Sequence, residues 1–499
     1  MEKSKRSLYT AISSVILTLV NGLFGFVVTK LIIIHYGSDF NGLNATVTQF
    51  INMLLIVEGG FTLATNVALF KPLSVSKYEI VNSILSATRR IFIKIGLLFF
   101  VIGILASIIY TIIINSNLPK SIIFMTLMMT VISTVFNLIF TTKYRILIQT
   151  EQKEYIINLV NIITIFLTQI LIILIILFQQ HMLIVRFIIM LGSIFNGLMI
   201  GYVCRKSYNF IDFSVKPNYK LIRGTKDVFV QKFTSMVYTS VPIVYISMTA
   251  GTIYASIFAV YNSVFSILKN VIYSFVNAPR IGFGRLIAER NKNYVMKVFL
   301  QYEFIVIILI SGILSTAAVL ILPFIGIYTR GVEDIDYIDK YLAVILIGIT
   351  FFEIIHIPSG NIINMAGKFK IGKNIQNIAC ISLITLMIIG NHLFSFYGIL
   401  LSVLFTSIIL AILEIYYIHV VYFKDGLAVF LRILIPNTIF SIILVYIEVA
   451  FLPKISGYIY FFIIGLFILL INYLLIVIIN LLINRKLTVG FFKRLLKLF

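Results

Sequence analysis

Residues 165–178 read IFLTQILIILIILF, a run that is apolar on all sides of a helix. Transmembrane β-strands instead alternate apolar and polar residues, so this run does not fit a membrane barrel. With its flanks it belongs to an apolar segment from 155 to 178, and about 20 such residues cross about 30 Å of hydrocarbon as a helix. The run therefore predicts a transmembrane helix and an all-α fold.

The rest of the chain has the same character. Of its 499 residues, 60% are hydrophobic and 12% are charged, and the mean hydropathy is +1.08. These values lie outside the range of soluble globular domains and predict an integral membrane protein. The sequence predicts about fourteen spans, at 8–34, 40–70, 95–114, 121–142, 155–178, 181–204, 227–250, 252–278, 299–327, 341–365, 374–389, 395–423, 433–451 and 458–484.

The net charge of +22 is distributed unevenly between the two sides of these spans. Of the 40 Lys and Arg residues, 32 fall on the side that holds both termini and 4 on the other side. Because Lys and Arg accumulate in cytoplasmic loops, both termini are predicted to be cytoplasmic. The same distribution explains the basic charge without a nucleic-acid partner. The basic residues left inside the spans are Lys30, Arg186, Lys232 and Lys269.

An internal repeat divides the chain. An offset of about 214 lays residues 37–61 over 251–275, and an offset of 216 lays TEQKEYIINLVN (150–161) over AGKFKIGKNIQN (366–377). Six spans per repeat is an even number, so both halves have the same orientation, as in transporters with parallel repeats. We expect six-helix bundles at 1–204 and 227–423, a cytoplasmic linker at 205–226 that acts as a hinge or as a plain connector, and two extra helices with a basic amphipathic tail at 424–499.

Polar residues gather on the second and eighth spans. Within LIVEGGFTLATN (55–66), Glu58 lies in a long apolar segment, where an ionised carboxylate costs roughly 2.5 to 3.5 kcal/mol. Such polar faces predict a central hydrated cavity between the halves, and the alternative is an inert ion pair of Glu58 with Lys269. The predicted substrate-binding residues are Lys269, Glu58, Asn52, Asn262, Ser266, Lys232 and Asn270.

The tenth span carries FFEIIHIPSG (351–360), in which Glu353 and His356 share a helix face just before a proline. With the backbone carbonyl freed by Pro358, these groups and Glu58 are candidates for binding a coupling H⁺ or Na⁺, and the alternative is a satisfied polar kink. Glu303, Glu448, Lys30 and Arg186 lie near span ends and are expected to reach toward headgroups. Glu414 lies deeper, and its own span, the twelfth, offers it no obvious partner. No other cofactor and no metal site is predicted.

No Walker A loop, GxSxG elbow, HExxH motif or CxxC pair occurs, which favours a carrier over an enzyme. Four segments are similar to a known family: YGSDFNGLNATVTQF (36–50), VEGGFTLATNVALFKPL (57–73), YRILIQTEQKEYI (144–156) and FAVYNSVFSILKNVIYSFVNAPRIG (258–282). Through them the chain resembles the O-antigen or capsule repeat-unit flippases, bacterial polysaccharide transporters of the multidrug/oligosaccharidyl-lipid/polysaccharide exporter superfamily.

The resemblance implies a V-shaped pair of six-helix bundles that opens a central cavity alternately to the two sides of the bacterial cytoplasmic membrane. It implies export of an undecaprenyl-pyrophosphate-linked oligosaccharide, with membrane lipids and the polysaccharide polymerase machinery as partners. Lys269 and Lys232 would hold the pyrophosphate. Two alternatives stay open: a cation-coupled multidrug or metabolite exporter of the same superfamily, and a membrane glycan polymerase or ligase.

Overall fold

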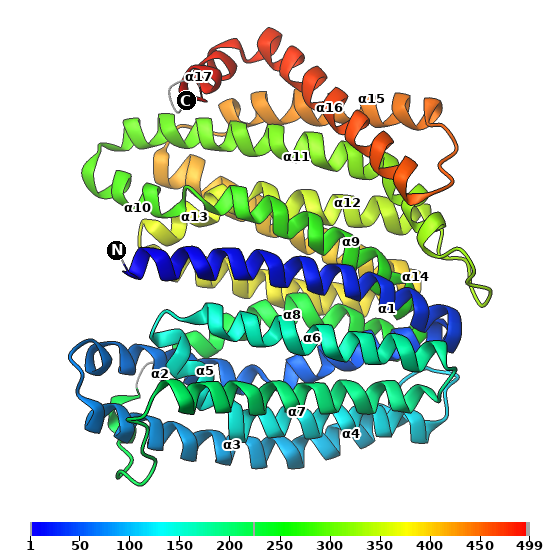
Figure 1. Cartoon of the computed structure of the whole chain (residues 1–499). Coiled ribbons are helices and arrows are strands. Elements are labelled where there is room, and N and C mark those ends of the chain that lie inside the picture. The colour runs from blue at the N-terminus through cyan, green and yellow to red at the C-terminus, as the bar shows by residue number, and fades with distance from the viewer. Residues whose placement is uncertain (1, 223–224, 496–499) are drawn as a thin grey trace. The chain divides into compact units, whose positions relative to one another are not determined.

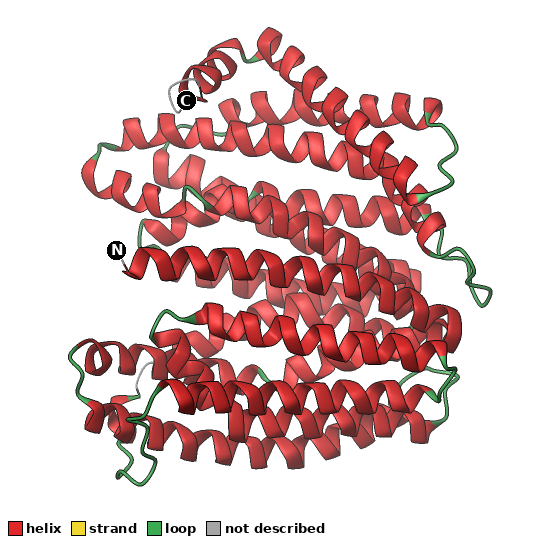
Figure 2. Cartoon of the chain, in the orientation of Figure 1, coloured by secondary structure: helices red, strands yellow, loops and turns green. Residues whose placement is uncertain are grey.

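In the computed structural model, residues 2–222 and 225–495 are described, and this part of the chain consists of helices joined by loops (Figure 1). Figure 2 shows no strand among the described residues, which confirms the all-α prediction. The side chain of Lys232 lies outside the described part, so its predicted role stays a prediction.

Eleven described helices are long and apolar enough to cross a membrane, which makes this a multi-pass membrane protein. Each of the fourteen predicted spans lies in helix, but two pairs of neighbouring spans join without a separate loop. Helix α1, Glu2–Leu54, is two segments joined at Gly37, and α14, Phe369–Tyr416, is two segments joined at Ser395. The seventh span lies in α8, Thr225–Thr249, of which Met236–Thr249 is an apolar stretch.

The bend in α1 depends on Gly37. Its backbone has φ 83° and ψ 166°, a region that is essentially open only to glycine because a Cβ would clash there. The glycine of YGSDF therefore lets the chain reverse between two apolar segments without a separate loop. This is why the first two predicted spans appear as one continuous element.

The contacts of the chain group into two units, Met1–Ile257 and Phe258–Phe499. This boundary falls inside α9, Thr252–Asn277, and the predicted limits of the two bundles stay a prediction. In the first unit α1 packs on α6 and α8, α2 packs on α8, and α7 packs on α4 and α6. Besides α1, its elements are α2 (Ile56–Ser74), α3 (Tyr78–Ile113), α4 (Lys120–Phe136), the π-helix η1 (Asn137–Thr141), α5 (Thr142–Thr150), α6 (Glu154–Leu177), α7 (Met182–Ser207), the 3-10 turn η2 (Tyr219–Leu221) and α8 (Thr225–Thr249).

In the second unit the long helix α11, Lys292–Tyr328, packs against α12, α15 and α16 around a core that includes Phe299 and Phe304. The other elements are α10 (Arg280–Glu289), α12 (Lys340–Ile355), α13 (Ile357–Met365), α14, the π-helix η3 (Tyr417–Phe423), α15 (Ala428–Phe451), α16 (Tyr458–Ile483) and α17 (Arg485–Leu495). The predicted basic tail thus begins as a helix, and α17 packs on α11 and α16.

The polar connector between α7 and α8 is docked on the first unit. Asn82 of α3 donates to the carbonyl of Phe210 at 2.7 Å and accepts from the amide of Asp212 at 3.2 Å. The amide of Asn218 donates to the carbonyl of Ser83 at 3.2 Å, and the ring of Phe210 stacks on Tyr78. The connector up to Asn218 is therefore fixed to α3, and a hinge stays a prediction for the residues beyond it.

Both repeats interrupt their fourth helix at the same place. At the 216-residue offset, Asn137, where η1 begins, corresponds to Glu353, two residues before α12 ends. In the second unit the interruption is the bend at His356, followed by Pro358 early in α13. Interruptions of this kind free backbone groups and redirect side chains, and they are frequent at functional sites.

Candidate functional site

Glu58, whose cost in an apolar segment needed an explanation, lies in the first turn of α2. A carboxylate is stabilised there by the positive end of the helix dipole. Its Oε1 accepts from the hydroxyl of Thr62 at 3.5 Å, and the carboxylate interacts electrostatically with Arg145. Helix start, hydroxyl and guanidinium together offset the cost of the charge.

The predicted spans leave Arg145 in a loop after the fourth span, but the structure places it in helix α5, Thr142–Thr150. The helical run Lys120–Thr150 continues through η1 into α5 and carries Arg145 as a half-buried side chain. Its Nη2 donates to Oδ1 of Asn196 on α7 at 2.8 Å. The cation that acts on Glu58 therefore belongs to the same unit.

The remaining polar face of the second span is divided by packing. Asn41 is buried and donates to the hydroxyl of Ser256 at 2.7 Å. Asn52 is exposed and donates to Oε1 of Gln49 at 3.4 Å, an oxygen that also accepts from Ser240. Part of the predicted face therefore holds helices together, whereas Asn52 on the same face stays accessible.

In the second unit, Lys269 on α9 and Glu353 on α12 form an ion pair with an Nζ to Oε2 distance of 3.0 Å. Their side chains are 19% and 11% exposed, so the pair is neither fully solvated nor sealed in the core. On the same helix as Lys269, Asn262 and Ser266 are half-buried and Asn270 is exposed. The structure thus joins a predicted substrate residue to a predicted ion-coupling residue.

His356 has a different partner from Glu353. At the bend between α12 and α13, its Nδ1 lies 2.8 Å from Oε2 of Glu414 on α14. The partner of Glu414, for which its own span offers no obvious candidate, therefore comes from another helix. Among the residues that the structure describes, no three His, Cys, Asp or Glu side chains cluster closely enough to hold a metal ion.

Gly360 keeps room for this His–Glu pair, and its replacement is our first prediction. A Cβ at residue 360 would lie 2.6 Å from Oε2 of Glu414. Gly360→Ala should therefore displace the carboxylate and weaken the His356 contact. We expect a destabilisation of about 1–3 kcal/mol, from overpacking and a lost hydrogen bond, measured by thermal unfolding in detergent. Gly367→Ala is an unsuitable comparison because Gly367 has a φ of +68°, whereas Gly282→Ala, with nothing within 4 Å, is the matched control.

Two charges predicted to reach toward headgroups are instead inside the protein. Glu303 on α11 is 1% exposed, and its Oε1 lies 3.0 Å from Nε2 of His419 in η3, which is 0% exposed. Arg186 on α7 is buried in the first unit. Position near a span end did not predict the exposure of these two side chains, because neighbouring helices cover both of them.

Comparison with known proteins identifies solved structures that are similar over nearly the whole chain. No family model matches the chain, and no curated protein matches it. Among solved structures, the lipid II flippase MurJ in an inward closed conformation has a TM-score of 0.69 at 18% identity, covering 96% of this chain and 99% of that one. This chain has the fold of MurJ.

Other structures with this fold are transporters. An inward-facing multidrug resistance MATE family transporter of the MOP superfamily has a TM-score of 0.66 at 11% identity, covering 79% of this chain and 92% of that one. A MOP superfamily transporter from Pyrococcus furiosus, described as having a binding pocket of reverse polarity, has a TM-score of 0.53 at 11% identity, covering 85% and 97%. The MurJ fold is thus shared by proteins with different cargo, and substrate has to be argued from residues.

Proposed function

We propose that this protein is a flippase, not an enzyme, that moves an undecaprenyl-pyrophosphate-linked oligosaccharide from the cytoplasmic to the outer leaflet of the bacterial cytoplasmic membrane. The observation that carries the proposal is the partly exposed ion pair between Lys269 on α9 and Glu353 on α12. Helix α9 also presents Asn262, Ser266 and Asn270. A pyrophosphate-sugar head cannot enter hydrocarbon unsolvated, so it needs such polar surface, while its prenyl tail can stay in lipid.

In this proposal Lys269 exchanges its partner. Without substrate, Glu353 neutralises Lys269 and limits the cost of a lone charge at this depth. When a pyrophosphate binds Lys269, Glu353 loses its counter-ion and becomes a site for H⁺ or Na⁺. Substrate binding and ion uptake would then be linked at one pair of residues, with His356 and Glu58 as further candidate coupling groups.

The membrane potential would add a driving force. Moving one negative charge out of a cell with a negative interior is favoured by about 2.3 kcal/mol per 100 mV. A pyrophosphate head is anionic, so its outward movement gains from the potential, with or without a coupling ion.

Reconstitution tests the proposal directly. Purified protein in liposomes should move fluorescent undecaprenyl-pyrophosphate-linked saccharides between leaflets, measured as loss of protection from a membrane-impermeant quencher, and a potential should bias the direction. The partly exposed carboxylate Glu353 in the second unit favours a cation-coupled multidrug exporter as second candidate. Proton-competed binding of a cationic dye, with no movement of the lipid-linked sugar, would decide for that exporter.

A further inference from the structure

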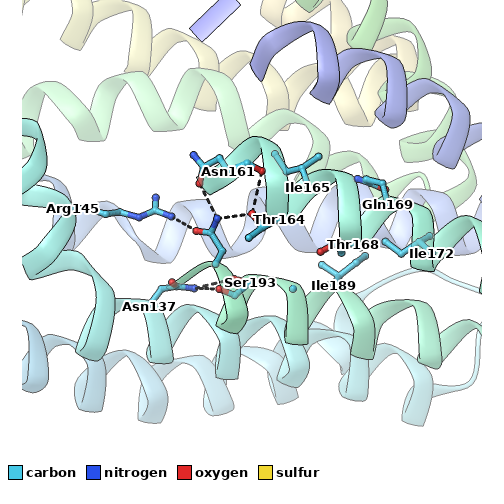
Figure 3. Close-up of a pocket in the computed structure, with 12 residues that line it drawn as sticks. Asn137, Arg145, Asn161, Thr164, Ile165, Thr168, Gln169, Ile172, Ile189 and Ser193 are labelled. Atoms are coloured by element: carbon cyan, nitrogen blue, oxygen red, sulfur yellow. Dashed lines mark hydrogen bonds between the residues drawn. The ribbon is translucent and has the colours of Figure 1, made fainter. Parts of the chain in front are cut away.

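A cavity of about 340 Å³ lies within the first unit, lined by η1, α5, α6 and α7. Figure 3 shows that its two ends differ in chemistry. Asn137 and Arg145 lie toward one end, whereas Ile172, Ile189 and the amide side chain of Gln169 lie toward the other. The cavity is separate from the Lys269–Glu353 pair, which belongs to the second unit.

The polar end is held by a chain of hydrogen bonds. Asn196 accepts from Arg145 and donates to Oδ1 of Asn161 at 2.9 Å and to the hydroxyl of Thr164 at 2.7 Å. Asn137, placed by the π-helix, donates to the hydroxyl of Ser193 at 2.9 Å. These contacts fix the side chains before any ligand binds, which reduces the ordering cost of binding.

Several buried atoms around the cavity lack a partner among the described residues. They are Nε of Arg145, a donor, and Oδ1 of Asn137 and Oε1 of Gln169, both acceptors. A buried polar atom left unpaired costs about 1–3 kcal/mol. The side chains of the lining thus carry both donors and acceptors, which suits the hydroxyl groups of a sugar.

The charge of the lining and the volume of the cavity restrict the class of ligand further. Arg145 is the charged residue of the lining, and a guanidinium prefers a phosphate or carboxylate as acceptor. A volume of about 340 Å³ lies near the lower limit of ligand pockets, which start at about 300 Å³, so one ring fits better than an oligosaccharide.

We propose that this cavity binds one sugar ring that carries an anionic substituent, with Arg145 on the anion and the amides on the hydroxyl groups. The inference rests on the proposed function, because it assigns the ring to the headgroup of the lipid-linked substrate. It places the recognition of this sugar in the first unit.

Binding to the full-length protein in detergent tests this site without any transport step. The probes are N-acetylglucosamine 1-phosphate, glucuronic acid, neutral N-acetylglucosamine and inorganic phosphate. The binding of each probe is measured by thermophoresis. We expect saturable binding of at least one anionic sugar, more tightly than of neutral sugar or phosphate alone. Arg145→Gln should weaken it about tenfold or more, the scale of one charge-assisted contact, and Arg145→Lys should weaken it less.

Arg205→Gln is the matched control, because its guanidinium bonds the hydroxyl of Tyr144 and does not line the cavity. Thr168→Leu fills the cavity while leaving Arg145 in place, so it should also block binding. Each variant is compared with the wild type by gel filtration and thermal unfolding, which separates lost binding from lost folding.

The site is rejected if the wild type binds no anionic sugar, which would mean that the cavity holds only water. It is also rejected if Arg145→Gln and Arg205→Gln bind alike, or if inorganic phosphate binds as tightly as the sugars. Any of these results leaves the flippase proposal standing when reconstituted protein still moves lipid-linked substrate. Failure of reconstituted wild type to move that substrate, with sugar binding intact, would reject the flippase instead.

Discussion

Lys269→Ala is expected to slow movement of the lipid-linked sugar by about 30-fold or more, with the amount of folded protein unchanged. Truncating one member of a desolvated charge pair typically costs 2–5 kcal/mol in binding, and about 2 kcal/mol corresponds to 30-fold. Here the lost partner is also the proposed anchor of the pyrophosphate, so both binding and the exchange at Glu353 should fail. The measurement is the initial rate of leaflet exchange in liposomes, normalised to protein content.

Lys269→Ala removes the proposed pyrophosphate anchor and also leaves Glu353 without its cation. A second variant has to separate these two effects. Lys269→Ala with Glu353→Gln removes both charges and should fold as the wild type while remaining inactive. Lys269→Arg should keep much of the activity because the charge stays. Lys340→Ala, an exposed lysine at the start of α12, is the matched control. Wild-type rates in the double variant would contradict the anchor, because Lys269 would then serve only to neutralise Glu353.

The helical segments could be predicted from sequence because the length of an apolar run is a local property. A span needs about 20 apolar residues whatever it packs against, and each predicted segment lies in helix. The helix ends were harder. The segment YRILIQTEQK is polar enough to suggest a loop, yet the helix continues to Thr150 and carries Arg145 with it.

Pairing of buried charges could not be predicted from spacing along the chain. His356 and Glu414 are 58 residues apart, and Glu303 and His419 are 116 apart, so tertiary packing alone brings them together. A usable signal was present for two of these glutamates, because Glu303 and Glu414 could each be matched with a histidine in another apolar span. Deep ionisable side chains in membrane proteins pair with one another, so they should be counted together and not one at a time.

Glu303→Ala should destabilise the protein more than any other single substitution considered above. With exposures of 1% and 0%, Glu303 and His419 are both removed from solvent, and the rings of Phe299 and Phe430 lie beside the imidazole. Removing one member of a buried pair costs about 3–5 kcal/mol because the other is left without compensation. Unfolding in detergent, followed by heat or denaturant, measures the loss.

Two further variants separate the pair from the space it fills. Glu303→Gln keeps a hydrogen-bonding side chain opposite His419 and should cost about 1 kcal/mol. Glu303→Leu with His419→Phe replaces the pair by apolar groups beside Phe299 and Phe430, and such replacements are often neutral or stabilising. Glu303→Gln should also flip lipid-linked sugar at the wild-type rate. The Glu303–His419 pair is buried between α11 and η3, whereas Glu353 is partly exposed. Normal stability with abolished flipping in Glu303→Gln would contradict a structural role and make Glu303 a coupling residue.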